Sequence, residues 1–416
     1  MDCRVIKLDF PELIARNIVY LDSAASSLKP RSVIEAMRSF MESSYANVHR
    51  GVYSISMEAS RAYEEAHEVV ARFINAWSWD EVVFVKNTTE AVQLLTLLLA
   101  FNNIIGRGDE IIVTEADHHS NILPWIRIAR IIGARVKLLP VDGNGIPRWE
   151  LLEEMVSKKT KIITFSHASN VTGYVNDVRR IARIAHDIGA LIAIDAAQSV
   201  PHMKIDVREL KVDFMAFSGH KMLGPTGIGV LWGRRDLMEK LEPPLGGGGT
   251  VKRVMLNGSG VSIEWEELPW RFESGTPPII ESIGLMEAIR YLERIGMDNV
   301  EQHEKKLTAY ALKRLEELGD GIKILGPRDA SIKLGIVAFN VRNVDPSMVG
   351  LWLDQHGIAV RTGLHCAHIL HDKLGAPNGS VRVSFYIYNC LEDVDKLESS
   401  VEELLKTIKK ETRSSL

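Results

Sequence analysis

A lysine with an unusual setting lies near the middle of the chain. Lys221 ends the stretch Ser218-Gly219-His220-Lys221, which directly follows the apolar run 213–217 and precedes another glycine, Gly224. A lysine on the surface needs no such setting, because water solvates its charge there. An amine shielded from water loses its proton more readily and becomes a better nucleophile. The stretch therefore indicates a lysine that forms a covalent bond, such as a Schiff base with an aldehyde.

Polar residues at the ends of other apolar runs could act together with this lysine. They are Asp195 and Gln198 at the end of run 191–195, Thr88 and Thr89 after run 81–85, and His118 after run 110–114. Several of them suit a part of pyridoxal phosphate (PLP). A carboxylate keeps the pyridine nitrogen protonated, so that the ring accepts electrons. Hydroxyls at a helix N-terminus bind the phosphate, and an imidazole can stack on the ring. Together with Lys221, these residues favour PLP as the cofactor.

Each of these residues also has an ordinary structural alternative. Asp195 could cap the next helix, and Thr88 or Thr89 could be a plain N-cap. His118 could belong to a hydrogen-bonded loop. No nucleotide motif competes, because the glycines at 246–249 do not complete the dinucleotide fingerprint and no lysine has the Walker A spacing. The coincidence of several such residues at strand ends carries the cofactor hypothesis.

A second group of residues surrounds a thiol. Cys366 lies in the segment Arg361-Thr-Gly-Leu-His365-Cys366, and Arg382 follows in the next apolar run. Arg361 and Arg382 are natural partners for a substrate carboxylate, because a guanidinium can bond both of its oxygens. Positive charge from Arg361 and His365 would favour the thiolate, which is the nucleophilic form of cysteine. Composition alone fits a plain buried cysteine equally well.

A metal site is an alternative for the same segment. His365, Cys366, His368 and His371 are all possible ligands of a soft metal ion. Their spacing matches no standard zinc pattern, and ligands this close in sequence would crowd one another. We therefore predict no metal site, and His368 and His371 receive no role.

The elements that must position these residues follow an alternating pattern. Strands are predicted at 81–85, 110–114, 135–140, 160–166, 191–195, 214–218 and 229–232, with helices such as 88–101 and 124–132 between them. Continuous apolar strands separated by helices indicate a mostly parallel sheet covered on both faces. The predicted fold class is therefore α/β. Ligands of such sheets bind outside the carboxyl ends of the strands, where the residues above are expected to meet.

The alternating pattern breaks after residue 245. A glycine-rich segment predicts a hairpin insertion at about 246–270, followed by a long helix at about 278–295. The remainder carries helices at both ends and strands near 335–341 and 358–361. We predict an N-terminal arm at 1–18, a large cofactor-binding domain at 19–285 and a smaller α+β domain at 286–416, which carries the cysteine loop.

Composition excludes several classes of partner. The 416 residues have a formal net charge of −4 and no long basic run, which argues against nucleic acid and anionic membranes. The longest apolar run, 91–101, is too short to span a bilayer, and the N-terminus lacks a signal-peptide core. Three cysteines are too few for a disulfide framework. We therefore expect a reducing, cytoplasmic compartment, with Cys3 and Cys390 structural or incidental.

Several motifs resemble one enzyme family. They are Ser218-Gly-His-Lys221 with Gly224-Pro-Thr-Gly227, Asp195-x-x-Gln198, Thr88-Thr-Glu90, His118-His119 and Arg361-Thr-Gly-x-His-Cys-Ala367. Together they resemble the class V, fold-type I PLP enzymes, and within these the cysteine desulfurases of the SUF type, which are similar to selenocysteine lyases. The resemblance runs from about Val19 to the segment around Arg382. The thiol motif is the most specific, because the wider aminotransferase group shares the lysine but not this cysteine.

The resemblance implies a role for each candidate residue. Lys221 would form the Schiff base, Asp195 would pair with the pyridine nitrogen, Gln198 would bond the ring hydroxyl, and His118 would stack on the ring and assist protonation. Thr88, Thr89, Ser218 and His220 would hold the phosphate, and Thr276 would reach the phosphate from the other subunit. Asn170 and Arg382 would bind the substrate carboxylate with Arg361 near the substrate, and Cys366 would accept the sulfur.

The implied activity is conversion of L-cysteine to L-alanine, with the sulfur passed to Cys366 as a persulfide that supplies iron–sulfur cluster assembly. The resemblance also implies a homodimer, with the hairpin near Asn257 contacting the partner subunit, and a sulfur-acceptor or scaffold protein. A selenocysteine lyase, a class V aminotransferase and a non-catalytic scaffold that retains the pocket are the alternatives. After Ala367 the chain reads His368-Ile-Leu-His371 where similar enzymes often have Met-Pro, so the acceptor is left unassigned.

Overall fold

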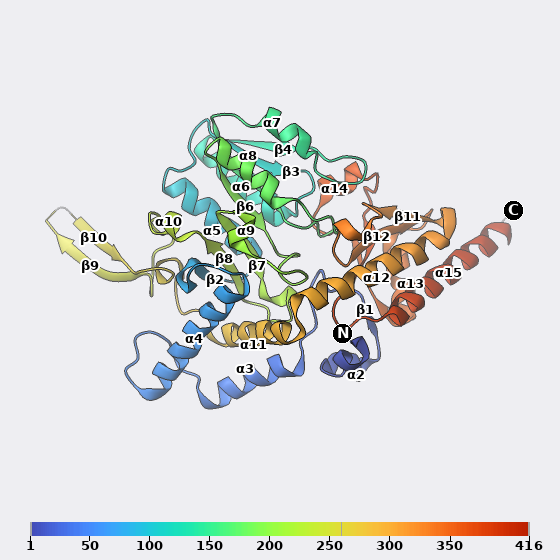
Figure 1. Ribbon diagram of the computed structural model, residues 1–416, viewed down its shortest axis with the longest axis horizontal. Helices are drawn as coiled ribbons and strands as arrows, with labels where there is room; N and C mark the ends of the chain where they lie inside the picture. Colours follow the sequence, from blue (N-terminus) through green and yellow to red (C-terminus); the bar gives the residue numbers. More distant parts are fainter. Residues whose placement is uncertain (1, 259, 415–416) are drawn as a thin grey trace.

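Two large sheets carry the chain in a computed structural model that describes residues 2–258 and 260–414 (Figure 1). The first has seven strands in the order β2-β8-β7-β6-β5-β3-β4. Their bounds are β2 Val82–Val85, β8 Gly229–Gly233, β7 Phe214–Ser218, β6 Leu191–Asp195, β5 Thr160–Ser166, β3 Glu110–Thr114 and β4 Arg135–Leu139. β8 runs opposite to the other six strands, which share one direction. The predicted, mostly parallel sheet is confirmed.

Helices cover both faces of this sheet because its inner strands are apolar on both sides, whereas the edge strand β4 carries Arg135 and Lys137. Val83 and Val85 of β2 belong to a core cluster with α5 (Thr88–Phe101) and α6 (His119–Ile132). Val82 and Phe84 point the other way, into a cluster with α3 (Arg31–Ser43), α4 (Ser54–Phe73), α8 (Val178–Asp187) and α11 (Ile279–Ile295). Short helices α7 (Leu152–Met155), α9 (Val207–Leu210) and α10 (Arg235–Met238) complete this part of the chain. Because helices cover both faces of the sheet, the ends of its strands are left open for a binding site.

One predicted helix start is wrong. We expected the helix after β3 to begin at Pro124, because proline favours the first turn of a helix. Helix α6 begins at His119 instead, and Pro124 lies inside it. The His118 side chain caps the helix by accepting a hydrogen bond from the Ser120 amide, so the helix starts before the proline.

The second sheet is antiparallel and has four strands in the order β11-β12-β15-β14. Its strands are β11 Ile322–Leu325, β12 Ile336–Val341, β15 Ser380–Ser384 and β14 Arg361–Gly363. Helices α12 (Met297–Glu317) and α13 (Pro346–Gln355) contact it, α15 (Leu391–Ser414) contacts these two helices, and α14 (His368–Lys373) follows β14. The predicted boundary at residue 285 lies inside the continuous helix α11, so the division between domains stays a prediction.

The N-terminal arm lies against the start of α15, where Lys7 pairs with Asp393. It contains α1 (Cys3–Lys7) and α2 (Pro11–Arg16) and ends in β1 (Val19–Tyr20), which pairs in parallel with β13 (Ile358–Ala359). The pairing carries the next residues of the chain, beginning with Asp22, toward the arginines of β14 and β15. A short strand that is far in sequence from the other residues of the site therefore helps to build it.

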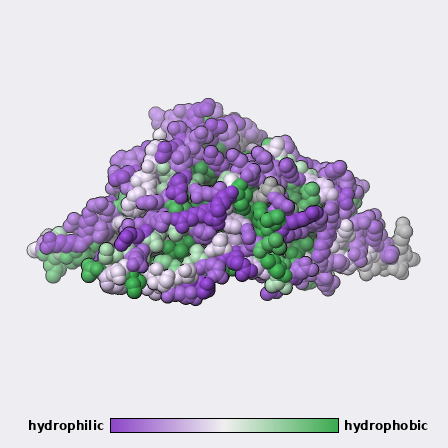
Figure 2. All heavy atoms as spheres, turned by 60° about the horizontal axis from the view of Figure 1, so that its bottom comes forward, coloured by the Kyte–Doolittle hydropathy of each residue, from purple (hydrophilic) through white to green (hydrophobic). Residues whose placement is uncertain are grey.

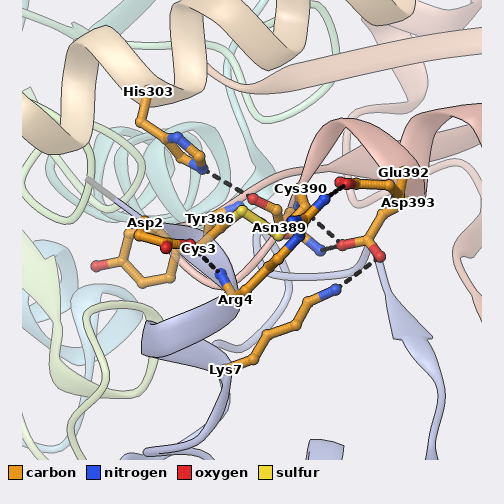
Figure 3. Close-up of a disulfide and its surroundings, with 10 residues drawn as sticks. All are labelled: Asp2, Cys3, Arg4, Lys7, His303, Tyr386, Asn389, Cys390, Glu392 and Asp393. Carbon is orange, nitrogen blue, oxygen red and sulfur yellow. Dashed lines mark hydrogen bonds and ion pairs between the residues drawn. A yellow bond between two sulfur atoms is a disulfide. The ribbon is translucent and has the colours of Figure 1, made fainter.

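A disulfide joins the N-terminal arm to the residue before α15, so Cys3 and Cys390 are structural, although the cysteines of the chain were expected to be too few for a disulfide framework. Cys3 and Cys390 are bonded, with Cα atoms 5.7 Å apart, within the usual range for a disulfide. Figure 3 shows Lys7 beside it, in an ion pair with Asp393 at 2.8 Å. The sequence does not reveal the bond, because 387 residues separate the two cysteines. The inference of a reducing compartment from cysteine usage therefore loses its support.

The predicted hairpin insertion is present as β9 (Val251–Asn257) and β10 (Gly260–Trp265), which pair in an antiparallel manner. It projects from the body of the molecule (Figure 1). Its side chains Val254, Leu256, Val261 and Ile263 are exposed, and Figure 2 shows apolar side chains gathered on it. An exposed apolar hairpin is typical of a contact surface.

In the described ranges, the helices are all too short or too polar to cross a lipid bilayer.

Candidate active site

One cavity collects nearly all of the predicted site residues. It has a volume of about 280 Å³, close to the lower end of typical ligand pockets, and lies at the carboxyl ends of the parallel strands. Its walls include Thr88, Thr89, His118, Asn170, Asp195, Gln198, Ser218, His220, Lys221, Arg361, Cys366 and Arg382. Residues from both sheets therefore meet at one place.

Thr276 lies elsewhere. It lines a separate cavity of about 340 Å³ between the segment 272–278 and the start of α5. A role for Thr276 in the site of another subunit stays a prediction. Among the residues that the structure describes, no three His, Cys, Asp or Glu side chains are placed to hold a metal ion.

Lys221 ends a short 3-10 turn, Gly219–Lys221, directly after β7. Gly219 is required there, because a Cβ atom would lie 2.9 Å from the Ile228 side chain. Burial lowers the pKa of the Lys221 amine to about 8, while the nearby Asp195 carboxylate opposes the shift. An amine with this pKa is partly neutral near physiological pH and can act as a nucleophile.

A set of hydrogen bonds that the sequence does not reveal holds this turn, and we call this set the clamp. The carbonyl of His220 accepts hydrogen bonds from the Ser27 amide at 3.0 Å, from the Ser26 hydroxyl at 3.1 Å and from Lys29 Nζ at 3.0 Å. Lys29 is half-buried, and this burial lowers the pKa of its amine to about 8. The run of donors Ser26-Ser27-Leu-Lys29 was the only signal in the sequence, and nothing in it points to residue 220.

Asp195 and Gln198 lie side by side after β6. Burial raises the pKa of Asp195, while a hydrogen bond from the Ala197 amide at 2.9 Å and the Lys221 charge act against that shift. Gln198 donates from Nε2 to the Ala24 carbonyl at 2.8 Å. Its Oε1 is buried and has no hydrogen-bond partner among the described residues. A free acceptor in the cavity wall fits a ligand hydroxyl.

The N-terminus of α5 supplies hydroxyls and amides. Asn87 caps the helix by accepting from the Glu90 amide at 3.0 Å. The hydroxyls of Thr88 and Ser218 are 2.6 Å apart, and Thr89 Oγ1 is 2.7 Å from Ser120 Oγ. Gly229 of β8 allows this approach, because a Cβ atom there would lie 2.6 Å from Asn87 Cα. The arrangement suits an anion such as phosphate.

His118 enters the cavity as a neutral imidazole. Its Nδ1 accepts from the Ser120 amide at 3.0 Å. Burial, with a smaller contribution from the Lys221 charge, lowers the pKa of His118 to about 3. The preceding residue, Asp117, holds the loop by accepting from the Thr114 and Ser166 amides at 2.8 and 2.6 Å. Burial raises the pKa of Asp117 to about 6, and the sequence analysis gave this residue no role.

The two arginines share a carboxylate that the sequence analysis did not assign. Arg361 bonds Asp22 through Nε at 3.0 Å and Nη2 at 2.8 Å, and Arg382 reaches Asp22 at 3.2 Å. Arg382 is buried and also donates to the Asn170 carbonyl at 3.0 Å. Burial lowers the pKa of Arg382 to about 10, against the effect of Asp22. The trio keeps a net positive charge, which attracts a carboxylate.

Cys366 is the free cysteine of the described chain and is exposed. Asn170 Nδ2 donates to the His365 carbonyl at 2.8 Å, and the His119 amide donates to the Cys366 carbonyl at 2.8 Å. Burial, aided by the charge of Arg382, holds the pKa of His365 far below its usual range. The expectation that His365 contributes positive charge beside the thiol is therefore wrong, and Arg361 is the cation that remains.

The fold and the cavity define an α/β enzyme of the fold-type I class, with a substrate site between a large parallel sheet and a smaller C-terminal sheet. The chain belongs to the aminotransferase class-V family, whose model matches residues 19–397.

Individual relatives resemble nearly the whole chain. A probable cysteine desulfurase of Aeropyrum pernix is 58% identical over 407 residues, covering 97% of this chain and 98% of that protein. A cysteine desulfurase of Haloferax volcanii is 44% identical over 92% of this chain and 89% of its own length. The apo structure of a cysteine desulfurase from Thermococcus onnurineus has a TM-score of 0.91 at 42% identity, covering 97% of this chain and 98% of that one.

Proposed function

We propose that this chain is a PLP-dependent cysteine desulfurase. It converts L-cysteine to L-alanine and transfers the sulfur to Cys366. The observation that carries the proposal is the wall of one cavity, which combines the Lys221 amine, the Asp195 carboxylate and the free Cys366 thiol. An aminotransferase of the same fold needs the first two groups but has no use for the third.

The residues of the cavity fit PLP. Lys221 offers an amine to the aldehyde, and the Gln198 Oε1 acceptor without a partner suits the ring hydroxyl. The start of α5 offers hydroxyls and helix amides to the phosphate. His118, neutral and capping α6, is available to lie against the ring. These features support PLP as the resident cofactor.

Bound in this cavity, PLP supplies an electron sink that weakens the bonds at the substrate α-carbon. Asp195 stays close enough to Lys221 to interact with its charge, and its role is to keep the pyridine nitrogen protonated. Lys221 would hold the cofactor through its amine, and the same amine would take the α-proton of the substrate. With its pKa lowered to about 8, this amine is a competent base near neutral pH.

The arginine pair binds the substrate carboxylate. Asp22 neutralises only one of the two positive charges of Arg361 and Arg382, and Arg382 Nε is buried without a partner among the described residues. An incoming carboxylate supplies the missing negative charge and an acceptor for that N–H. The Asn170 backbone carbonyl bonds Arg382, and its side-chain Nδ2, which donates one hydrogen to the His365 carbonyl, has a second N–H that can assist in the same place.

Cys366 supplies the nucleophile for sulfur transfer. Its thiolate attacks the substrate sulfur, the Cβ–S bond of the substrate breaks, and an S–S bond forms on the enzyme. The electron pair of the broken bond remains with the three-carbon product, which takes up protons and leaves as alanine. One L-cysteine and one thiol give one L-alanine and one persulfide, so no further oxidant or reductant is needed.

The proposal extends to partners. A homodimer brings the apolar hairpin β9–β10 onto a second copy and Thr276 to the phosphate site of that copy. The exposure of Cys366 suits delivery of sulfur to an acceptor or scaffold protein of iron–sulfur cluster assembly. The division into an arm, a large domain and a small domain, and a cytoplasmic location, belong to the same proposal.

Alanine release tests the function. Purified protein loaded with PLP should form alanine from L-cysteine in the presence of a thiol reductant, and should form none from pyruvate and an amino acid donor other than cysteine. Cys366→Ala should lose most of this activity. Near-normal alanine release by Cys366→Ala would refute the sulfur-acceptor role, and transamination without desulfuration would favour the aminotransferase.

A further inference from the structure

The hydroxyl of Ser380 lies between two imidazoles on the loop side of the second sheet. Ser380 Oγ is 3.1 Å from His365 Nε2 and 3.0 Å from His371 Nε2. Ser380 and His371 have no exposed surface, although none of the roles above uses either residue. The hydroxyl therefore connects β15 to both sides of the Cys366 loop.

The hydrogen-bond pattern fixes which nitrogen carries each proton. His371 Nδ1 lies 2.9 Å from the Ala367 carbonyl, which can only accept, so Nδ1 carries the hydrogen. Burial lowers the pKa of His371 and of His365, so each ring is neutral and holds one hydrogen. His371 Nε2 must then accept from the Ser380 hydroxyl. The Ser380 oxygen, in turn, accepts from His365 Nε2–H.

The loop between these two histidines has an unusual backbone. His365 and Cys366 have φ angles of 47° and 54°, in the left-handed region that residues with a side chain avoid. Their carbonyls, and that of Ala367, accept hydrogen bonds from Asn170, His119 and His371 respectively. Such a conformation persists only when its surroundings hold it.

We propose that Ser380, acting with His371, is a positioning residue for Cys366. The hydroxyl orients both imidazoles, one of which belongs to the residue directly before Cys366, and so keeps the loop in its left-handed conformation with the thiol facing the cavity. The proposal rests on the proposed function, because it assigns importance to the thiol that accepts the sulfur. It does not depend on the chemistry at Lys221.

Ser380→Ala separates the two steps. In the PLP-loaded protein, the absorbance change on adding L-cysteine reports substrate binding at Lys221, and persulfide on Cys366, followed by peptide mass spectrometry, reports sulfur transfer. We expect persulfide formation to slow at least tenfold while the absorbance change keeps its rate within twofold. In the protein without cofactor, amide hydrogen exchange across residues 363–368 should become faster.

Three further variants make the test specific. Ser380→Thr keeps the hydroxyl and should recover most of the transfer rate. Ser380→Ala combined with His371→Ala should be no slower than the slower single variant, because the groups act as one unit. Ser282→Ala is the control, since this serine is equally buried and bonds only the Ile279 carbonyl within α11.

The outcomes are distinct. Unchanged transfer and unchanged hydrogen exchange in Ser380→Ala would overturn the proposal. An equal loss of both steps, or the same loss in Ser282→Ala, would also overturn it, because either result indicates a general effect on folding. If the unmodified protein forms no persulfide, the proposed function fails, whereas the hydrogen-exchange comparison still decides whether Ser380 holds the loop.

Discussion

Two buried lysines of this chain have the same lowered pKa and opposite surroundings. Burial lowers the pKa of Lys221 and of Lys333 to about 8. Lys221 lies in the wall of the active-site cavity near Asp195. Lys333 is 1% exposed, and its amine donates to the Pro327 carbonyl at 3.1 Å. A lowered pKa therefore indicates that an amine is buried. An amine becomes useful for catalysis when it also lies in a cavity with suitable partners.

The position of Lys333 explains its burial. The segment around it adds backbone hydrogen bonds to the loop after β5: Val175 donates to the Ile332 carbonyl at 3.0 Å and Leu334 donates to the Gly173 carbonyl at 2.9 Å. The same loop carries Asn170 to the cavity. Lys333 is therefore enclosed in the contact between the second sheet and this loop, where its amine meets no substrate.

The largest expected effect separates the two lysines directly. Lys221→Met should lower turnover of L-cysteine by roughly 10³-fold or more, because it removes both the cofactor anchor and the base. Lys333→Met should keep turnover within about twofold, because Lys333 touches nothing in the cavity. Alanine release by the two PLP-loaded variants measures this difference. Comparable losses of turnover in both variants would show that a place in the cavity wall is not what distinguishes Lys221 from Lys333.

A smaller loss of turnover is expected when Asp195, the carboxylate near Lys221, is replaced. Burial is the cause of the lowered pKa of Lys333, with no carboxylate of the described residues acting on it. Asp195→Asn keeps the shape of the side chain but removes the charge that holds the pyridine nitrogen protonated. Turnover should fall by roughly 10²- to 10³-fold while PLP still binds, as judged from the visible absorbance of the purified variant. Retention of more than half of the turnover would show that the carboxylate is not the relevant partner.

The next prediction concerns stability and pH. The folded-state pKa of Lys333 lies near 8, below its ordinary value of 10.5, so the folded protein binds fewer protons than the unfolded chain between these pH values. Stability from this group therefore rises as the pH increases from about 8 to about 10.5, and below pH 8 the shift costs about 3 kcal/mol. Lys333→Met should raise the free energy of unfolding by about 2 kcal/mol at pH 7, part of the cost being offset by lost contacts.

Denaturant unfolding at pH 7 and at pH 10 measures this gain. The gain in the free energy of unfolding should be smaller at pH 10, because the amine of the unmodified protein is then neutral in the folded state. A variant that is less stable at pH 7, or equally stabilised at both pH values, would contradict the account of Lys333.

The smallest effect on turnover is expected at the half-buried Lys29. Lys29 donates to the His220 carbonyl at 3.0 Å and so supports the turn that carries Lys221, without lining the cavity itself. Lys29→Met should reduce turnover about tenfold, since the loss of one hydrogen bond to a charged donor costs about 1.5 kcal/mol or more. The Michaelis constant for L-cysteine should change less than the turnover number. An unchanged turnover number would show that Lys29 does not help to hold the turn that carries Lys221.

The sequence predicted the residues that follow strands and missed those that arrive from elsewhere. Lys221, Asp195, Thr88 and His118 could be found because strand periodicity places them at one edge of a parallel sheet. Asp22 could not, because only the pairing of β1 with β13 brings it to the arginines.

The same limit applies to longer connections. Ser380 reaches the Cys366 loop across the register of β14 and β15, in which Gly363 pairs with Ser380. The disulfide joins Cys3 and Cys390 only because the arm lies against the start of α15. Spacing along the chain holds no information on contacts between such distant segments.

Borohydride reduction of the PLP-loaded protein, followed by peptide mass spectrometry, tests the central claim most directly. Reduction fixes a Schiff base permanently on the amine that formed it, so the modified lysine can be read from its peptide. The account predicts one modified residue, Lys221, and no modification of Lys29 or Lys333. Cofactor attached to another lysine, or to none, would contradict it.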